Sequence, residues 1–532
     1  MKPPCDEAAI RSGPTDSPCA PQDGPWILAA TILASSMAFI DATVVNVALP
    51  ALQSAFHATL TDVQWVVESY SLFLGALILV GGSAGDLFGR RRVFLYGIVL
   101  FALASAACGI SQSIHQLVAA RALQGIGAAL LTPGSLAIIS ASFPEHERGR
   151  AIGTWSGFTA ITTALGPVFG GWLIQHASWR WIFFLNLPLA IGVVVVSLWR
   201  VPESRGGWGK RLDIPGAMLV TFALGGLVYA LIESPRAGWT HPVVLGSLLL
   251  GIACLSAFPF FERRSRSPMV PLEMFRSRVF TGANLLTLFL YAAIGVFFFL
   301  FPMNLIQVQG YSATAAGGAA LPLILLIFFL SRWSGGLVAH FGPRLPLVVG
   351  PTIAAVGFLL FAVPSIGGSY WTTFFPAFLV LGFGMAVSVA PLTTVVMDSV
   401  GPERAGTASG INNAVARVAG LLAIAVFGIV MVKAFAVGLD HQLAAVEISP
   451  AARAEMLSNS IKLAAVEVPA NLDPRLSGEV RSAIAHAFVF AFRLATYCCA
   501  GLAFASAVIA GVMIERRKAS RLPAKGDAEK AA

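Results

Sequence analysis

One carboxylate stands inside a long apolar run near the start of the chain. Asp41 follows Phe39 and Ile40 in a run of apolar and small residues that begins at Trp26. An aspartate at the centre of a membrane-spanning helix costs roughly 2.5 to 3.5 kcal/mol on insertion scales, so an ionisable residue in such a place is expected to have a function. A carboxyl group there can bind and release a proton or another cation. Asp41 is therefore the first candidate for an ion-coupling site, and the rest of the chain must supply the helices that expose it to two sides.

Two other ionisable residues in apolar runs could work with Asp41. If the first run crosses the membrane outward and the second inward, Asp41 and Glu68 both lie in the outer half, where they could approach each other. Arg121 is a cation inside the fourth run and needs a partner, and Gln124 shares its helix face. We expect Asp41 and Glu68 to couple proton movement, and Arg121 to pair with an acid. The alternatives are a helix-packing hydrogen bond for Asp41, a water-exposed rim position for Glu68, and a purely structural pair of Arg121 with Asp41.

The composition indicates a membrane protein. The chain has 532 residues, of which 57% are hydrophobic and 11% charged, with a mean hydropathy of +0.78, whereas soluble chains carry about 25% charged residues. Because the first 25 residues lack the apolar region of a signal peptide, we expect the first span to act as the insertion signal. The six cysteines form no CxxC pair and the eight histidines are scattered, which predicts no disulfide framework, no metal site and no cofactor.

Fourteen apolar runs are long enough to cross a bilayer, which takes about 17 to 25 residues. They fall at 26–49, 64–83, 93–111, 114–142, 150–174, 181–199, 214–232, 243–261, 279–301, 314–338, 345–364, 371–397, 405–432 and 485–514. An even number places both ends on one side, and most of the 35 lysine and arginine residues fall on that side, as at Arg90–Arg92 and Arg263–Arg278. The positive-inside rule then predicts that both termini are cytoplasmic.

An internal repeat divides the chain. The segment Gly82–Arg91 after the second run is similar to Gly335–Arg344 after the tenth, at an offset of 253 residues. Two six-helix halves with two extra helices between them explain this offset, and repeated halves build a midplane site in many secondary transporters, which work by rocking around it. We therefore expect an all-α membrane protein with fourteen transmembrane helices. Its expected parts are a disordered cytoplasmic tail (1–25), an N-terminal six-helix bundle (26–200), a linker with two extra transmembrane helices (201–278), a C-terminal six-helix bundle (279–515) with an outer loop (433–484), and a cytoplasmic tail (516–532).

Three small-residue segments have spacings that favour close helix contacts. The loop after the second span is short and contains Gly82, Asp86, Gly89, Arg90 and Arg91. In the fifth span, one small-residue face and a proline kink are formed by Gly166, Pro167, Gly170 and Gly171, and a second face by Gly153 and Gly157. In the thirteenth span, one stripe is formed by Gly406, Gly410, Asn413, Arg417 and Gly420. Arg417 is either a counter-charge to the acids of the first half or the partner of a local group.

Five motifs occur in an order typical of one family. Together they resemble the major facilitator superfamily, specifically the fourteen-span drug:proton antiporter (DHA2) branch that includes QacA-type and methylenomycin-resistance-type exporters. The resemblance spans about residues 26 to 515. The motifs are the stretch Phe39–Pro50, the loop Gly82–Arg92, and the segments Leu117–Gly127, Gly166–Gly171 and Trp179–Pro188.

The resemblance implies roles for several of these residues. The matching arginine, Arg121, tunes proton release from the coupling acid, and Asp86 is a gate latch that contacts a helix N-terminus of the other half. Leu87 replaces the usual basic residue, and Ala339 replaces the acid in the second copy, so the second latch is expected to be weak or absent. In the alternative reading, the arginines of the loop are topology anchors only. The Gly-Pro-x-x-Gly-Gly order resembles the antiporter signature, although Thr162 departs from it. Candidate cavity residues are Asn46, Gln124, Asn413 and Arg417.

The function implied is proton-coupled export of amphipathic small molecules, as in multidrug or antibiotic efflux, across the cytoplasmic (inner) membrane. The expected partners are a small-molecule substrate, protons and the lipid bilayer, without nucleic acid, and the chain is expected to act as a monomer; docking of a periplasmic adaptor is left open. Proton-coupled uptake, export of one endogenous metabolite, and a transport-inactive sensor or scaffold are the alternatives. Enzyme chemistry is not expected, since Gly206–Arg211 lacks the Walker spacing and the GxSxG match at Gly81–Gly85 ends a membrane helix.

Overall fold

The structure is a computed structural model that describes residues 23–205, 212–265, 267–400, 404–469 and 472–515. The expected tail 516–532, nearly all of the tail 1–25, and the Gly206–Arg211 segment lie outside the described residues. Fourteen helical stretches in the described part are long and apolar enough to cross a membrane, and the described residues contain no strand. The predicted all-α membrane fold with fourteen spans is confirmed.

Each predicted run corresponds to one span. The spans are α2 (Gly24–Phe56), α3 (Leu60–Phe88), α4 (Arg90–Ile110), α5 (Ile114–Ser142), α6 (Glu145–His176), α7 with α8 (Trp181–Phe184, Asn186–Arg200), α9 (Ile214–Ala237), α10 (Pro242–Arg264), α11 (Arg278–Met303), α12 with α13 (Ala313–Gly318, Leu321–Phe341), α14 (Arg344–Phe361), α16 (Phe375–Asp398), α17 (Ala405–Leu443) and α19 (Pro474–Met513). Short elements between them are η1 (Leu272–Arg276), η2 (Asn304–Val308), α15 (Tyr370–Thr373), α18 (Pro450–Ser458) and η4 (Ser460–Ala465).

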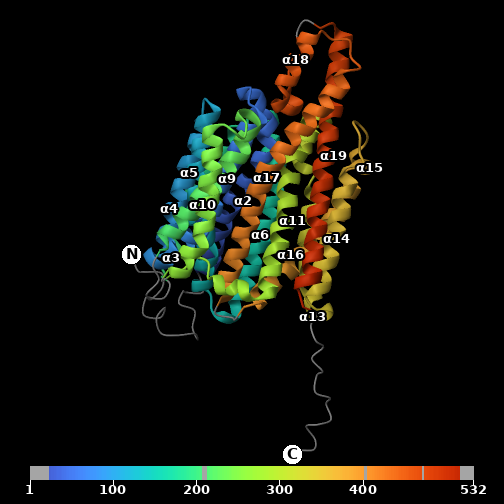
Figure 1. Ribbon diagram of the computed structural model, residues 1–532. Helices are drawn as coiled ribbons and strands as arrows, with labels where there is room; N and C mark the ends of the chain where they lie inside the picture. The colour runs from blue at the N-terminus through green and yellow to red at the C-terminus, as the bar shows by residue number, and fades with distance from the viewer. Residues whose placement is uncertain (1–22, 206–211, 266, 401–403, 470–471, 516–532) are drawn as a thin grey trace, which may run out of the picture.

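The two halves stand side by side (Figure 1), the linker helix α9 contacts both of them, and α10 packs against α9. Helices α2 to α8 form the N-terminal half and α11 to α19 the C-terminal half. Helix α9 packs where the halves meet, because Leu72 of α3, Val228 of α9 and Leu421 of α17 belong to one buried cluster. The even number of spans brings the first and last described residues to the same end of the molecule. We call the opposite end the outer end.

The internal repeat is visible in the packing of the third and fourth span of each half. Gly97 of α4 and Gly127 of α5 lie so close that a Cβ on either would come within 2.9 Å of the other's carbonyl oxygen. Gly350 of α14 and Gly384 of α16 make the same reciprocal contact, at 3.0 and 2.8 Å. The loops repeat as well, since Gly89 and its counterpart 253 residues later both end a helix with a positive φ, 112° and 75°. The two halves therefore share a backbone plan.

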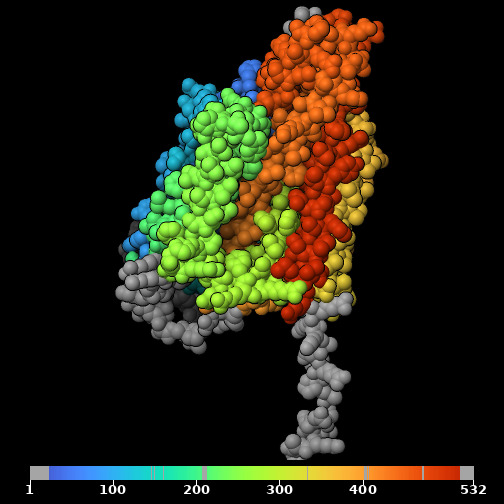
Figure 2. All heavy atoms as spheres, viewed as in Figure 1, coloured from blue at the N-terminus to red at the C-terminus, as the bar shows by residue number. Residues whose placement is uncertain are grey.

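The segment 433–484, expected as an outer loop, is mostly helical. Helices α17 and α19 run on past the other spans, and α18 joins them at the top of Figure 1, where the space-filling view shows the orange projection above the rest (Figure 2). Ser449 and Asp473 cap α18 and α19, accepting from backbone N–H groups at 3.2 and 2.8 Å, and such caps favour a helix start. Element η4 folds back toward the membrane-spanning part and packs against α2 and α3.

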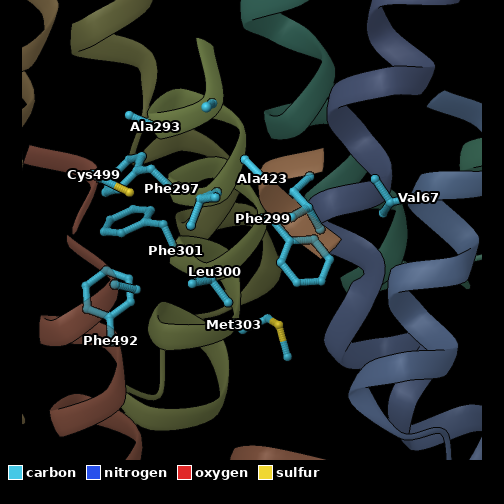
Figure 3. Packing of buried hydrophobic residues seen from close by; sticks show 14 of the residues in the cluster. Val67, Ala293, Phe297, Phe299, Leu300, Phe301, Met303, Ala423, Phe492 and Cys499 are labelled. Atoms are coloured by element: carbon cyan, nitrogen blue, oxygen red, sulfur yellow. The ribbon is translucent and has the colours of Figure 1, made fainter. Parts of the chain in front are cut away.

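The interior of the C-terminal half is aromatic. Phe297 and Phe301 of α11 stack on each other at 4.9 Å between ring centroids, and Phe301 also meets Phe378 of α16 at 5.1 Å. Figure 3 shows these two rings on the side of α11 toward Phe492 and Cys499 of α19. Phe299 and Met303 point to the other side of α11, toward α3 of the first half. Ring contacts therefore supply much of the packing of this half, together with polar contacts such as the one from Asn412 of α17 to Thr287 Oγ1 of α11 at 2.7 Å.

Candidate functional site: a buried polar network and a separate acid

The predicted coupling residues divide into a closed pair and a separate acid. Asp41 of α2 and Arg121 of α5 form an ion pair, in which an Arg121 terminal nitrogen donates to Asp41 Oδ2. The pair is sealed from solvent, with Asp41 0% and Arg121 1% exposed. Each charge neutralises the other, which offsets part of the large cost of burying either alone.

Amide and hydroxyl side chains complete the network around the carboxylate. Gln124 Nε2 donates to Asp41 Oδ1 at 2.8 Å, and Asn186 Nδ2 donates to the same oxygen at 3.3 Å. Gln124 Oε1 accepts from Arg121 at 2.7 Å. Ser105 Oγ accepts from Gln124 and Asn186 at 3.2 and 3.0 Å. These donors are arranged for the ionised form of Asp41, since a carboxylate accepts hydrogen bonds only.

Close helix packing brings Arg121 to its partners. A Cβ on Gly125 of α5 would lie 2.4 Å from the carbonyl oxygen of Tyr70 on α3, so only glycine permits this approach. Arg121 Nε then reaches the Val66 carbonyl at 3.2 Å, and its guanidinium lies 4.2 Å from the centre of the Tyr70 ring. A guanidinium over a ring face gains cation–π energy. The network therefore ties α3 to α2, α4, α5 and α8.

Some members of this network were not predicted from the sequence. Asn186 stands inside the quoted segment Trp179–Pro188, where a polar side chain in an apolar run could have been noticed. Ser105 and Tyr70 carry no such signal, because serine and tyrosine are common in membrane helices. Gln124, predicted as a cavity residue, is instead 0% exposed within the network.

Glu68 of α3 lies apart from this network. It is 0% exposed, and neither carboxyl oxygen has a hydrogen-bond partner among the described residues. The interpretation of Glu68 as a water-exposed rim acid is therefore wrong, because the second span packs against the other half at this depth. In the described part of the chain no hydrogen bond joins Glu68 to Asp41, so the expected approach of the two acids stays a prediction. Among the described residues, Glu68 is therefore a buried acid without a hydrogen-bond donor.

Glu68 faces the junction between the halves. Four residues before it, Gln64 donates to the Ile424 carbonyl of α17 at 2.9 Å. Seven residues after it, a Cβ on Gly75 would lie 3.7 Å from Cβ of Arg417, also on α17. Positions 64, 68 and 75 share one face of a helix, so Glu68 lies on the face of α3 that packs against α17.

Arg417 carries a second charge at this junction. Its side chain is partly buried, and no hydrogen bond or ion pair to it is found within the described ranges. The local-pair alternative therefore has no support in this conformation. Asn413, one turn away, donates to the Ser409 carbonyl of its own helix at 3.0 Å and is exposed. Asn46 Oδ1 of α2 is buried without a partner among the described residues.

The loop after α3 is held by two acids. Asp86 accepts from Arg90 Nε and from a terminal nitrogen of Arg90 at 3.0 and 2.9 Å. Glu203, which follows α8, accepts from the backbone N–H groups of Arg91 and Arg92 at 3.1 and 3.2 Å. An acid at a helix N-terminus satisfies free N–H groups and interacts favourably with the helix dipole. Glu203 was not predicted, because its contact is more than 100 residues distant in sequence.

The proline-kink segment of α6 makes the outer contact between the halves. A Cβ on Gly170 would overlap Val44 of α2, and one on Gly171 would lie 2.3 Å from the Ala313 carbonyl of α12. On the α12 side, a Cβ on Gly317 would lie 2.0 Å from the Pro167 carbonyl. This first small-residue face therefore closes the outer end.

Some of the other predicted small residues contact a neighbouring helix, and others have no close neighbour. A Cβ on Gly166 would lie 3.1 Å from Oγ1 of Thr43 on α2, and one on Gly82 would lie 3.6 Å from Pro133 of α5. The expected second face of α6 is not a close contact in this conformation, since Gly153 has no atom nearby and Gly157 meets only the Phe328 ring at 3.8 Å. No cluster of three or more histidine, cysteine, aspartate or glutamate residues gathers for a metal ion in the described part of the chain.

A two-bundle membrane fold with an internal repeat, and with ionisable groups buried at its centre, defines the class of secondary transporters. The sequence model described as Major Facilitator Superfamily matches residues 31–424. The chain belongs to this superfamily and is a multi-pass membrane transporter rather than an enzyme.

Similar proteins include named resistance proteins of bacteria. The chain is 37% identical to multidrug resistance protein Stp of Mycobacterium tuberculosis over 417 residues, covering 78% of this chain and 77% of that protein. It is 32% identical to the tetracenomycin C resistance and export protein of Streptomyces glaucescens over 506 residues, 94% of each. It is 31% identical to the methylenomycin A resistance protein of Bacillus subtilis, covering 76% of this chain and 87% of that protein. The predicted resemblance to drug-exporting members is confirmed.

Solved structures share the fold. A bacterial homologue of the human lysosomal transporter Spinster, in an inward-facing and unoccupied conformation, matches with a TM-score of 0.62 at 18% identity, covering 92% of this chain and 98% of that one. A D-xylose–proton symporter matches with a TM-score of 0.59 at 15% identity, covering 93% and 98%. At such low identity these matches show the fold alone.

Proposed function

We propose that the protein is a proton-coupled antiporter that exports amphipathic small molecules across the cytoplasmic membrane, with both termini in the cytoplasm. The named resistance and export functions of its relatives support export. The charge distribution supports the orientation. The observation that carries proton coupling is Glu68, an acid that is 0% exposed, lacks a hydrogen-bond donor among the described residues, and faces the junction that must move if the halves rock.

Glu68 is assigned as the proton carrier in this conformation. An isolated carboxylate in an apolar interior is far more costly than a neutral carboxylic acid, so the group takes up a proton there. If the halves rock apart along α3 and α17, Glu68 becomes hydrated, and the ionised form is then stable. One acid can thus hold a proton in one state and release it in the other, which is the requirement for coupling.

The Asp41 network has a different role in this proposal. Asp41 is already bound by Arg121, Gln124 and Asn186, so it fixes the helices of the N-terminal half in one arrangement. Proton binding at Asp41 requires Arg121 to lose its partner, which leaves a buried, unpaired cation at high cost. Asp41 is therefore a positioning residue whose loss affects coupling indirectly.

The available energy suffices for export. Each pH unit across the membrane contributes about 1.4 kcal/mol per proton, and 100 mV contributes about 2.3 kcal/mol per charge. Release of substrate at the outer end requires the contact between α6 and α12 at Gly171 and Gly317 to open. Asp86, Gly89 and the loop arginines are proposed to govern the opposite end.

Inverted membrane vesicles that contain the purified protein test this proposal. A pH-sensitive dye reports collapse of an imposed gradient, acid inside, when tetracenomycin C, puromycin or another amphipathic compound is added. We expect substrate-triggered proton efflux in wild type. In Glu68→Gln the efflux rate should be at least about 10-fold lower, which corresponds to about 1.4 kcal/mol, because an amide cannot bind the proton. Glu455→Gln, at an exposed position of α18, is the matched control. Full efflux in Glu68→Gln would assign coupling elsewhere, and no efflux with any compound would remove antiport.

A further inference from the structure

An outer cavity of about 560 Å³ lies between the two halves, away from Asp41 and Glu68. Its walls come from three parts of the chain. Val47 and Gln53 belong to α2 of the first half, Ile306 and Gln307 to η2 of the second, and Ala465 to η4 of the outer projection. The volume falls within the range of small-molecule sites, about 300 to 1,000 Å³.

Two glutamines that line this cavity have one unpaired donor and one unpaired acceptor between them. Gln307 Nε2 donates to Gln53 Oε1 at 2.8 Å across the junction. This bond leaves Gln53 Nε2 and Gln307 Oε1 buried without a partner among the described residues, and Gln53 is only 2% exposed. If the nitrogen and oxygen of both amides are exchanged, one donor and one acceptor are again left unpaired. A buried donor or acceptor without a partner costs about 1 to 3 kcal/mol, so the site favours a molecule that satisfies both.

The charges near this cavity are already paired with each other. Lys462 Nζ lies 3.2 Å from Glu467 Oε1, and His57 Nδ1 lies 3.9 Å from the same oxygen. Glu467 and His57 are largely exposed and stand at the mouth, whereas the Lys462 side chain is mostly buried and is paired with Glu467. Apart from the two amides and Ser54, the remaining wall is apolar. An uncharged molecule with an apolar body therefore fits the interior better than an ion does.

We propose that this cavity is an outer binding site for an uncharged amphipathic molecule with an adjacent hydrogen-bond donor and acceptor, as in a carboxamide. The carbonyl oxygen accepts from Gln53 Nε2, and the N–H group donates to Gln307 Oε1. Because the ligand contacts both halves and η4 at once, it holds the outer end closed. This last consequence depends on the proposed rocking transport, whereas the binding site does not.

Binding is tested by isothermal titration calorimetry on the full-length chain in lipid nanodiscs, with empty nanodiscs as the blank. The probes are octanamide, which has a donor and an acceptor, and N,N-dimethyloctanamide, which has only the acceptor. We expect saturable octanamide binding that is about 2- to 10-fold weaker for the dimethyl compound and for Gln53→Leu or Gln307→Leu, the range for one lost hydrogen bond. Equal binding of the two probes, or unchanged binding in Gln53→Leu, would overturn the site.

The matched control is Gln309→Leu, since Gln309 lies two residues from Gln307 but bonds Ser365 and Gly367 instead. Its octanamide affinity should equal that of wild type, and an equal loss in this variant would assign the effect to the fold and overturn the site. A thermal unfolding curve of each variant confirms that the protein is folded.

Closure of the outer end is measured by disulfide cross-linking. Thr314 Oγ1 donates to Gln175 Oε1 at 2.8 Å across the outer contact, so a Gln175→Cys/Thr314→Cys variant reports how often the two helices meet. We expect octanamide to raise the cross-linking rate several-fold, and Gln53→Leu to abolish the increase. An unchanged rate with retained binding would overturn the closing effect. Loss of proton-coupled export with retained binding would refute the proposed function but not the site.

Discussion

The two halves share a backbone plan, but the N-terminal half contains a buried polar network and the C-terminal half a cluster of packed phenylalanines. In the N-terminal half, the first, third, fourth and sixth spans contribute Asp41, Ser105, Arg121 with Gln124, and Asn186 to one polar network. In the C-terminal half the corresponding spans, α11, α14, α16 and α19, contribute phenylalanines that pack ring to ring. The four helices are therefore joined by a network of side-chain hydrogen bonds in the N-terminal half and mainly by aromatic packing in the C-terminal half, where Ser506 of α19 also donates to the Leu286 carbonyl of α11 at 3.3 Å.

This difference assigns different tasks to the halves. Buried charge pairs define one arrangement of the helices, since any other leaves charges unpaired. Aromatic packing is less directional and gives a stiff body of close-packed rings. We therefore expect changes in proton binding to act through the N-terminal half, while the C-terminal half moves as a rigid body against it. The predictions below test this division, beginning with the largest effect.

Arg121→Gln should lower the free energy of unfolding by about 3 to 5 kcal/mol, because removing one partner leaves a buried, uncompensated charge. Denaturant titration of the purified protein, followed by helical circular dichroism, measures the loss. The double variant Asp41→Asn/Arg121→Gln removes both charges and should be more stable than Arg121→Gln alone. If the double variant is equally or less stable, the ion pair is not what holds these helices.

Phe301→Ala should affect stability but not coupling. Phe301 is 1% exposed and its ring lies 5.1 to 5.5 Å from those of Phe361, Phe374 and Phe378. We expect a loss of about 2 kcal/mol, less than the 3 to 5 kcal/mol of a water-soluble core, because apolar side chains stay in lipid when membrane helices separate.

The ratio of protons to substrate in the vesicle assay should remain that of wild type in Phe301→Ala. Phe341→Ala, at a 63% exposed position of α13, is the control and should leave both quantities unchanged. A changed proton ratio in Phe301→Ala would show that the aromatic interior takes part in coupling, and the division between the halves would then be wrong.

The sequence predicts the spans well because bilayer thickness sets their length. The run expected at 93–111, for example, is α4 at Arg90–Ile110. The helical projection in 433–484 was missed because hydropathy, the signal used for the spans, says little about helices in water. Its signals were local ones, the caps Ser449 and Asp473.

The sequence indicates which residues belong to the site but not how their side chains are arranged. A charge in an apolar run marks Asp41, Glu68 and Arg121 as special whatever the fold. Which acid is paired and which is not depends on the depth and rotation of each helix, and these are set by contacts such as Gly125 against Tyr70. Contacts distant in sequence, such as Gln53 with Gln307, carry no local signal.

The smallest predicted effect is a change in stability at the N-terminus of α4, which follows the first copy of the repeated loop, compared with α14, which follows the second copy. In the first copy, Glu203 caps α4 by accepting from the N–H groups of Arg91 and Arg92, whereas no side chain of the described residues caps the corresponding α14. Glu203→Gln keeps an acceptor but removes the negative charge at the helix N-terminus, so we expect a loss of about 0.3 to 1 kcal/mol.

Glu273→Gln, whose carboxylate is 72% exposed and only loosely paired with Arg404 at 3.6 Å, is the matched control and should change stability by less than about 0.5 kcal/mol. Hydrogen exchange at the first turn of α4 localises the change, because fraying there accelerates exchange of these amides and leaves those of α14 unaffected. Equal protection of α4 in wild type and Glu203→Gln would mean that the charge at this end is not needed, and that the two loops differ in sequence without differing in stability.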